Sequence, residues 1–181
     1  MKGQSNIRNY TISGIMFNGL AFLLLFPILL VYSTPYILSY GYLNFHEGLK
    51  SFLSISFLLT LPIGIIIHEA LHGFTWAIFA KKGLRSIRYG FNRKAMAPYC
   101  HCSEPLPKLH YMLGAAAPCV IMGIIPGVIA LMIASNWLII AAMFFTWAAS
   151  GDIISLWMLR KVDPHKLIYD HPLRPGFYTS D

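Results

Sequence analysis

Charged side chains are scarce in this sequence. Asp, Glu, Lys and Arg make up 12% of its 181 residues, whereas an ordinary soluble domain has roughly 25%. Apolar residues make up 56% and occur in long blocks, so the composition excludes an ordinary soluble protein. Cysteine is scarce too. The sequence has three, an odd number, which argues against a framework of disulfide bonds.

The apolar residues form four blocks, which cover residues 12–38, 51–80, 110–134 and 137–158. Each block is long enough to cross the hydrocarbon core of a bilayer, which is about 30 Å thick and needs ~20 helical residues. The first block lacks the short apolar region and the small-residue cleavage site of a signal peptide, so we expect it to remain as a helix. The sequence therefore predicts an all-α membrane protein with about four transmembrane helices, a short outer loop over 39–50, and a single domain over residues 1–181.

The basic residues lie almost entirely on one side of this predicted membrane protein. If the four spans alternate in direction, every one of the 14 Lys and Arg residues except Lys50 lies on the same side. Because cytosolic loops carry most of the Lys and Arg, we expect a multi-pass protein of the cell (inner) membrane with both termini in the cytosol. Its first partner is then the lipid bilayer. A basic loop beside a membrane also explains the cluster at 81–94, so we expect no nucleic acid partner.

The loop between the second and third spans, residues 84–109, is the one sizeable segment between helices outside the predicted membrane. Residues 87–91 alternate between large apolar side chains and Arg or Gly, a pattern typical of a strand. A second extended piece is expected over 96–102, with a turn near 92–94. The sequence thus predicts a short cytosolic element that resembles a β-hairpin.

The second span contains the segment HEALH, residues 68–72. His68 and His72 are four residues apart, so they lie on the same side of a helix, about 40° apart at ~100° per residue. Two imidazoles in this arrangement can hold one zinc ion. Glu69 is then close enough to act as a general base on a water molecule. The motif predicts a Zn²⁺ site for hydrolysis, and peptide bonds are its natural substrate.

Glu69 and Asp152 are the two acidic residues within the predicted spans. A charged group in the bilayer core costs about 2.5–3.5 kcal/mol on insertion scales, so each should have a partner. Asp152 lies roughly 12 Å before Arg160 along a helix, at a depth that matches His68 and His72, and we expect it to be the third metal ligand. The alternatives are that Asp152 pairs with a basic group or belongs to a proton path, and that the histidines are ordinary packed residues.

Further polar residues lie in the central loop. Cys100, His101 and Cys102 are three soft ligands in a row, which raises the hypothesis of a second zinc site, although the spacing is not CxxC and a fourth ligand is not evident. His101 could instead stabilise the oxyanion of the reaction. Asn92, Tyr99 and His110 are the other candidates for contacts to the oxyanion or the substrate.

With this motif on one membrane helix and Asp152 on a later one, the chain resembles a family of membrane zincin peptidases, a domain family of unknown function related in pattern to the site-2 proteases. The stretches that carry the resemblance are His68–Gly73, the loop Pro98–Pro105 that leads to Ala117 and Pro118, and Ser150–Asp152. The resemblance covers about residues 50–160. It implies an integral-membrane metallopeptidase with His68, His72 and Asp152 as zinc ligands and Glu69 as the general base.

We therefore predict a membrane-embedded zinc metallopeptidase of the HExxH type, which hydrolyses peptide or membrane-protein substrates. Three rival hypotheses stay open. The chain could be a membrane zinc hydrolase for another class of substrate, a non-catalytic metal-binding membrane protein or transporter subunit, or a structural membrane protein in which the motif occurs by chance.

Overall fold

The structure is a computed structural model, which describes residues 7–92, 97–171 and 176–180. The helices are α1 (Gly14–Tyr40), α2 (Tyr42–Ser51), α3 (Ile55–Phe79), α4 (Lys108–Pro118), α5 (Ile125–Ile133), α6 (Asn136–Ala148) and α7 (Ser150–Leu159), with a 3₁₀ turn over Gly83–Ser86 and a π-helical turn over Cys119–Ile124. The strands are β1 (Ile7–Thr11), β2 (Ile87–Asn92), β3 (Ala97–Cys102), β4 (Leu106–Pro107), β5 (Leu167–Asp170) and β6 (Gly176–Ser180).

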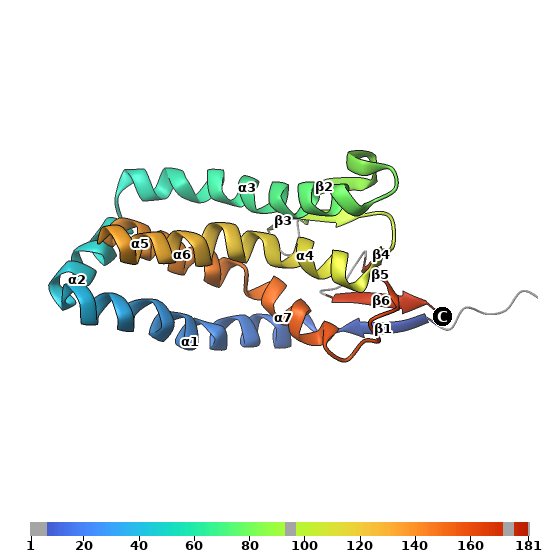
Figure 1. Cartoon of the computed structure of the whole chain (residues 1–181), viewed down its shortest axis with the longest axis horizontal. Coiled ribbons are helices and arrows are strands. Elements are labelled where there is room, and N and C mark those ends of the chain that lie inside the picture. Colours follow the sequence, from blue (N-terminus) through green and yellow to red (C-terminus); the bar gives the residue numbers. More distant parts are fainter. Residues whose placement is uncertain (1–6, 93–96, 172–175, 181) are drawn as a thin grey trace, which may run out of the picture.

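Long apolar helices form the body of the molecule. Three stretches are long and apolar enough to cross a membrane: α1, α3 and the run Lys108–Ile133, which joins α4 to α5. The pair α6 and α7 passes the same test but is bent by 49°. These stretches lie side by side and alternate in direction (Figure 1). Helices are therefore present at all four predicted places.

The last predicted span, residues 137–158, is not one continuous helix. The helix breaks at Ala149, whose ψ of 12° departs from helical backbone, and α7 begins at the next residue. The Ser150 hydroxyl donates to the carbonyl of Trp147 at 2.5 Å, and such bonds from serine back to a preceding carbonyl bend helices. The predicted span over 137–158 is therefore a bent pair of helices, and the break places Asp152 in the first turn of α7.

The segment between the first two spans is also more ordered than a loop. Residues 39–50 were predicted as a loop, but most of them belong to α2. This helix packs against the start of α6, where the side-chain amide of Asn136 donates to Asn44 at 3.1 Å. Gly48 makes the close approach possible, because a Cβ at this position would lie 2.5 Å from the carbonyl oxygen of Asn136.

Antiparallel strands cover one end of the helices (Figure 1). β2 pairs with β3, which confirms the predicted hairpin, although part of its predicted turn lies outside the described residues. A second sheet, of order β1-β6-β5-β4, was not predicted, so the all-α class is corrected to a mainly helical fold with antiparallel sheet. The physical reason is that β1 and β6 come from opposite ends of the chain. Neither strand is recognisable until the two pair.

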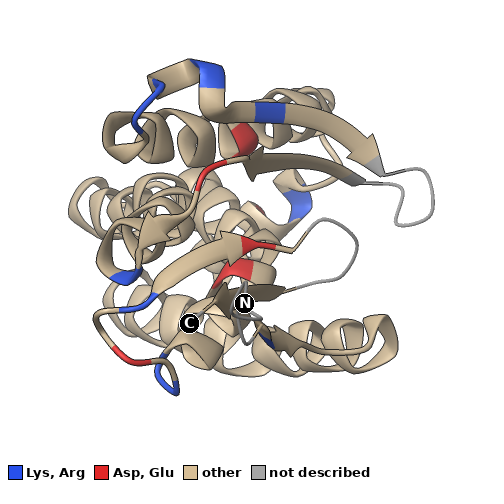
Figure 2. Ribbon diagram, turned by 90° about the vertical axis from the view of Figure 1, so that its right-hand side faces the viewer, with Lys and Arg blue, Asp and Glu red and all other residues tan. Residues whose placement is uncertain are grey.

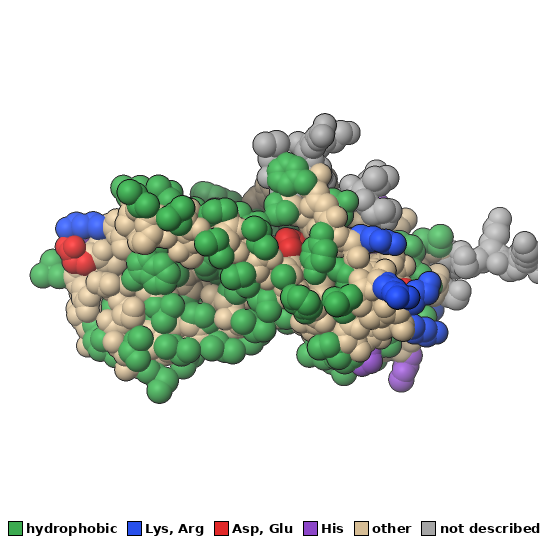
Figure 3. All heavy atoms as spheres, turned by 90° about the horizontal axis from the view of Figure 1, so that it is seen from above, with side chains coloured by type: hydrophobic (Ala, Val, Ile, Leu, Met, Phe, Trp, Pro, Cys, Tyr) green, Lys and Arg blue, Asp and Glu red, His purple; other side chains and the backbone are tan. Residues whose placement is uncertain are grey.

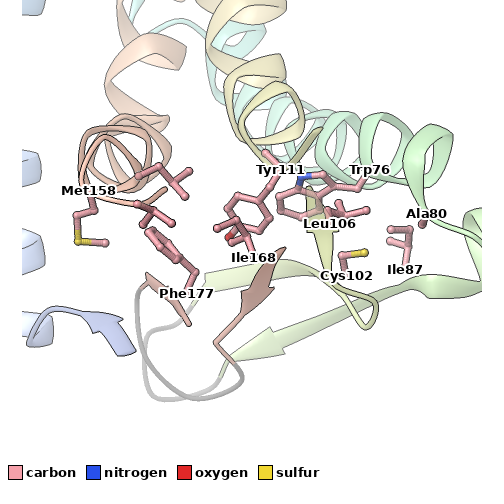
Figure 4. Close-up of a cluster of buried hydrophobic side chains, with 11 residues drawn as sticks. Trp76, Ala80, Ile87, Cys102, Leu106, Tyr111, Met158, Ile168 and Phe177 are labelled. Carbon is pink, nitrogen blue, oxygen red and sulfur yellow. Dashed lines mark hydrogen bonds between the residues drawn. The ribbon is translucent and has the colours of Figure 1, made fainter. Parts of the chain in front are cut away.

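Buried apolar side chains join this sheet end to the helices. The sheet-end cluster includes Trp76 of α3, Leu106 of β4, Tyr111 of α4, Ile168 of β5 and Phe177 of β6 (Figure 4). These residues come from five elements in three separate parts of the chain: α3, β4 with α4, and β5 with β6. The cluster therefore holds α3, α4 and the C-terminal strands in one arrangement, which positions the groups described in the next subsection.

The face of the molecule in Figure 3 is largely apolar, and its Lys and Arg side chains lie toward the two ends. Of the most apolar 18-residue stretch of α1, only 6% is buried inside the molecule. Ile15 and Leu38 are more than four-fifths exposed. Figure 2 looks onto the sheet end, where Lys and Arg lie on strands, turns and helix ends. Apolar patches of this extent are typical of a surface that another apolar phase covers.

Replacing Gly48 with Ala should lower the stability of the protein. Alanine favours a helix by roughly 1 kcal/mol over glycine, but overpacking against the Asn136 carbonyl should cost about 1–3 kcal/mol. The measurement is the thermal unfolding temperature of detergent-solubilised protein. Gly19→Ala is the matched control, because a Cβ at Gly19 in α1 would meet nothing within 4 Å. An unchanged or higher unfolding temperature for Gly48→Ala alone would contradict the packing of α2 against α6.

Candidate metal centre

The two histidines of the HEALH segment lie on one side of α3, near its end at the strands. The distance between their Nε2 atoms is 3.3 Å. Their ring centroids are 4.9 Å apart and the rings are nearly perpendicular. The side chain of His68 is 13% exposed and that of His72 is 8% exposed. The helical spacing thus brings two ligand nitrogens to one point in a largely buried place.

Asp152 completes this group from the first turn of α7. Its Oδ2 lies 3.2 Å from Nε2 of His68, and its Oδ1 lies 3.2 Å from Nε2 of His72. Among the described residues, these three side chains are the one group of His, Cys, Asp and Glu whose ligand atoms converge enough to hold a metal ion. The structure therefore brings together the three residues that the sequence suggested as ligands.

The separation of these atoms fits tetrahedral zinc. Zinc binds imidazole nitrogen and carboxylate oxygen at about 2.0–2.2 Å, so neighbouring ligand atoms in a tetrahedron lie roughly 3.3–3.6 Å apart. The three separations here are 3.2, 3.2 and 3.3 Å. Three protein ligands also leave the fourth position of a tetrahedron open, as in catalytic zinc sites.

The hydrogen bond of the other His72 nitrogen shows that this group needs a cation. Nδ1 lies 2.8 Å from the backbone carbonyl oxygen of Gly114, which can only accept, so Nδ1 carries the proton. In neutral His72 the lone pair of Nε2 then faces the Asp152 carboxylate, an unfavourable contact. A positive charge between them, either a metal ion or a second proton on the ring, removes the conflict. Such a bond from Nδ1 to a carbonyl is also the usual way to orient a metal-binding histidine.

The Gly114 carbonyl is available because of Pro118. In an α-helix this carbonyl would accept from the N–H four residues later, but proline has no N–H. Glycine at 114 also leaves room for the indole of Trp76, which a Cβ would displace. That indole stacks on His72, with ring centroids 5.2 Å apart, and donates to the carbonyl of Tyr111 at 3.1 Å. Analysis of the sequence missed these supporting groups, and the proline four residues after Gly114 was the available signal.

Glu69 lies beside the converging atoms but is not one of them. It is half-buried, and its carboxylate accepts a hydrogen bond from the backbone N–H of Cys100 in β3. The hairpin therefore reaches the predicted general base. Tyr89 of β2, which the sequence analysis did not single out, packs on Gly73, directly after the second histidine.

The other residues predicted near the site have different surroundings. His101 lies on β3 and donates from Nδ1 to Asp170 at 3.1 Å, a bond that raises the pKa of His101. The ring of Tyr99 lies against Gly90, and Tyr99 is 47% exposed. His110 stacks on Phe79, with ring centroids 4.1 Å apart. The backbone of Asn92 ends β2, and its side chain lies outside the described residues. None of the described side chains among these is in the metal-binding group.

The hypothesis of a second zinc site at Cys100, His101 and Cys102 is not supported. The described residues hold no second converging group of ligand atoms. His101 is instead engaged by Asp170, which also accepts from the hydroxyl of Tyr111 at 2.8 Å. These residues tie the hairpin to β5 and α4.

Comparison with known families agrees with this geometry. The family described as "Putative zincin peptidase" matches residues 61–167, a range that includes His68, His72 and Asp152. The chain belongs to this zincin peptidase family. Membership implies zinc, and the three converging side chains are suited to hold it. No curated protein and no solved structure shows a significant match. The matched part of this zincin includes His101 but ends before its partner Asp170.

Substitution of Asp152 should remove the metal. Wild-type protein purified in detergent should hold about one zinc ion per chain, as a mononuclear site does. Loss of a residue that only hydrogen-bonds to a metal ligand lowers metal affinity by roughly 10–100-fold. Asp152→Asn changes a ligand itself, so it should lower zinc affinity by more than this. Titration with a zinc-sensitive dye measures this. Asp170→Asn is the matched control, because Asp170 contacts His101 and Tyr111 but none of the three converging side chains. Equal zinc affinity in wild type and Asp152→Asn would contradict the assignment.

Proposed function

We propose that this zincin is a membrane-embedded zinc metallopeptidase with its active site near the cytosolic surface. The observation that carries the proposal is the convergence of Nε2 of His68, Nε2 of His72 and the Asp152 carboxylate at 3.2–3.3 Å. Zinc, when bound there, would act as a Lewis acid: it would polarise a peptide carbonyl and lower the pKa of water, so that water that has lost a proton can attack the carbonyl. The roles of the protein's own groups follow from their positions.

Glu69 is the proposed general base. It is adjacent to His68 on α3, so its side chain leaves the helix about 100° around the axis from that of the ligand. Its carboxylate is not among the converging atoms and is free of a metal-binding role. It can therefore take a proton from the attacking water and deliver it to the leaving amine. His68, His72 and Asp152 hold the metal, and the Gly114 carbonyl keeps the ring of His72 in the orientation that presents Nε2.

The proposed substrate is an extended segment of a peptide or of a membrane protein. Of the described strands, β3 is hydrogen-bonded to β2 alone, so its other edge has backbone groups with no strand partner. The Cys100 N–H on this edge donates to Glu69. A substrate that pairs with β3 would add a strand, a common way to bind peptides. It would also take over the Cys100 N–H and release the Glu69 carboxylate for catalysis.

The proposed orientation follows from the charges. The described Lys and Arg residues other than Lys50 lie on the strands, turns and helix ends at the sheet end or next to it (Figure 2). Cytosolic segments of membrane proteins carry the excess of basic residues. We therefore place the sheet end, with both chain termini, in the cytosol. The metal-binding residues, which lie near that end of α3, are then close to the cytosolic surface.

Glu69→Gln should keep zinc and lose hydrolysis. The amide is similar in shape to the carboxylate but cannot take a proton, so cleavage should fall by about 10²–10⁴-fold, the usual contribution of a general base. The assay is cleavage of a fluorogenic peptide library by detergent-solubilised protein, with zinc content measured on the same samples. Glu47→Gln is the matched control, because Glu47 lies in α2 and pairs with exposed Lys50. It should cleave like wild type.

Two results would overturn the proposal that this protein is a peptidase. One is cleavage by Glu69→Gln as fast as that by wild type. The other is a zinc-loaded wild type that cleaves no member of the library and no membrane-protein substrate in reconstituted vesicles. That second result would favour a non-catalytic metal-binding protein.

Backbone methylation of the best-cleaved library peptide tests the strand pairing. In an antiparallel or parallel pair, every second N–H of a strand points to its partner. Methylation of single amide nitrogens away from the scissile bond should therefore weaken binding at alternate positions, seen as a raised KM. Methylation at the positions between should have little effect. Weaker binding that does not alternate along the peptide would exclude pairing with β3.

A further inference from the structure

A basic cavity lies at the sheet end, beside the ends of α1 and α7. Its volume is about 420 Å³. Three basic residues line it: Arg8 of β1, and Lys161 and Lys166 of the segment after α7. The one acidic residue in its lining, Asp163, accepts a hydrogen bond from the backbone N–H of His165. The charges of the lining therefore sum to a positive value, which suits an anion.

An apolar groove lies between α1 and α7. Its volume is about 290 Å³. The α1 side consists of Leu20, Leu23 and Leu24, and the α7 side consists of Ile153, Ile154 and Trp157. Leu23 is 60% exposed and Trp157 is 51% exposed. The groove is therefore open at the surface that the proposed function places against lipid.

Cavity and groove follow one another along the same two segments of the chain. On one side, Trp157 of α7 belongs to the groove and Lys161, just after α7, belongs to the cavity. The Lys161 ammonium lies 5.4 Å from the centre of the Trp157 ring. On the other side, Arg8 precedes the start of α1, while Leu20 lies within it. The order is thus charged and then apolar on both sides, with a tryptophan at the transition, the place that tryptophan favours at a membrane interface.

We propose that cavity and groove together bind one anionic phospholipid. Arg8 and Lys161 would contact the headgroup phosphate, with Lys166 close by, and one acyl chain would lie along Leu23 and Trp157. Basic pockets at the cytosolic ends of membrane helices are suited to anionic headgroups. Phosphatidylcholine or phosphatidylethanolamine is disfavoured, because its cationic amine would enter a cavity lined by three cations. A free phosphate would use the cavity but not the groove.

The position of this site links it to the metal centre. Ile153 and Ile154 directly follow Asp152 in α7, and Gly151 packs on Phe17 of α1, whose ring a Cβ would approach to 2.7 Å. An acyl chain in the groove would hold α7 against α1 on the side next to that contact. Lipid binding itself requires neither zinc nor hydrolysis, so it can be measured apart from the peptidase activity.

The test is native mass spectrometry of detergent-solubilised protein titrated with dioleoyl phosphatidylglycerol, dioleoyl phosphatidylcholine or soluble glycerol 3-phosphate. Wild type should bind phosphatidylglycerol about tenfold or more tightly than phosphatidylcholine. The double variant Arg8→Gln, Lys161→Gln should lose this preference, because two basic contacts of this kind are worth about tenfold or more in affinity. Lys81→Gln, Lys82→Gln is the matched control, because it removes the same charge after α3, outside the cavity, and it should keep the preference.

A groove variant separates lipid from free phosphate. Leu23→Trp should fill the groove and weaken binding of phosphatidylglycerol. The unfolding temperature of each variant, compared with that of wild type, shows that it folds. Three results would overturn the proposal: equal binding of the two lipids by wild type, equal losses in the two double variants, or binding of glycerol 3-phosphate as tight as that of phosphatidylglycerol. The last would make the cavity a site for soluble phosphates.

Discussion

The contact of the Asp152 carboxylate with two imidazole nitrogens is the constraint on which the rest of this structure depends. An acid among apolar helices is costly unless a positive charge compensates it and hydrogen bonds orient it. Here the carboxylate oxygens lie 3.2 Å from His68 and His72, and the proton on His72 Nδ1 is directed to a backbone carbonyl. Nε2 of His68, Nε2 of His72 and the carboxylate oxygens of Asp152 converge on one place. That place is suited to a cation, and the family assignment makes zinc the natural one.

Two irregularities in the helices allow these groups to meet. The bend at Ala149 turns α7 away from the axis of α6 by 49°, and Asp152 comes in the first turn after it. Pro118 leaves the Gly114 carbonyl without a helical donor, so the carbonyl can accept from His72. Each feature would weaken a helix considered by itself. They are tolerated because neighbouring elements satisfy the groups that the irregularities release.

The two ends of the molecule differ in what they can do. At the end away from the strands, α2 packs closely against the start of α6. At the sheet end, the metal-binding residues, the open edge of β3 and the basic cavity lie within neighbouring elements. α7 carries Asp152 and also forms one wall of the apolar groove. Substrate, metal and lipid would then all act on one end of the helical bundle.

By itself, the sequence determined what depends on local pattern. Four apolar blocks placed the long helices, alternation over residues 87–91 placed β2, and the spacing of His68 and His72 put both on one side of α3. The cost of an acid within an apolar block was enough to indicate Asp152. Tertiary structure alone decided which groups meet across the chain: Gly114 with His72, 42 residues apart, and His101 with Asp170, 69 residues apart. It also decided the pairing of β1 with β6. Periodicity reports the face that a side chain occupies on its own helix or strand, whereas partners from distant segments are selected by packing, after those elements have formed.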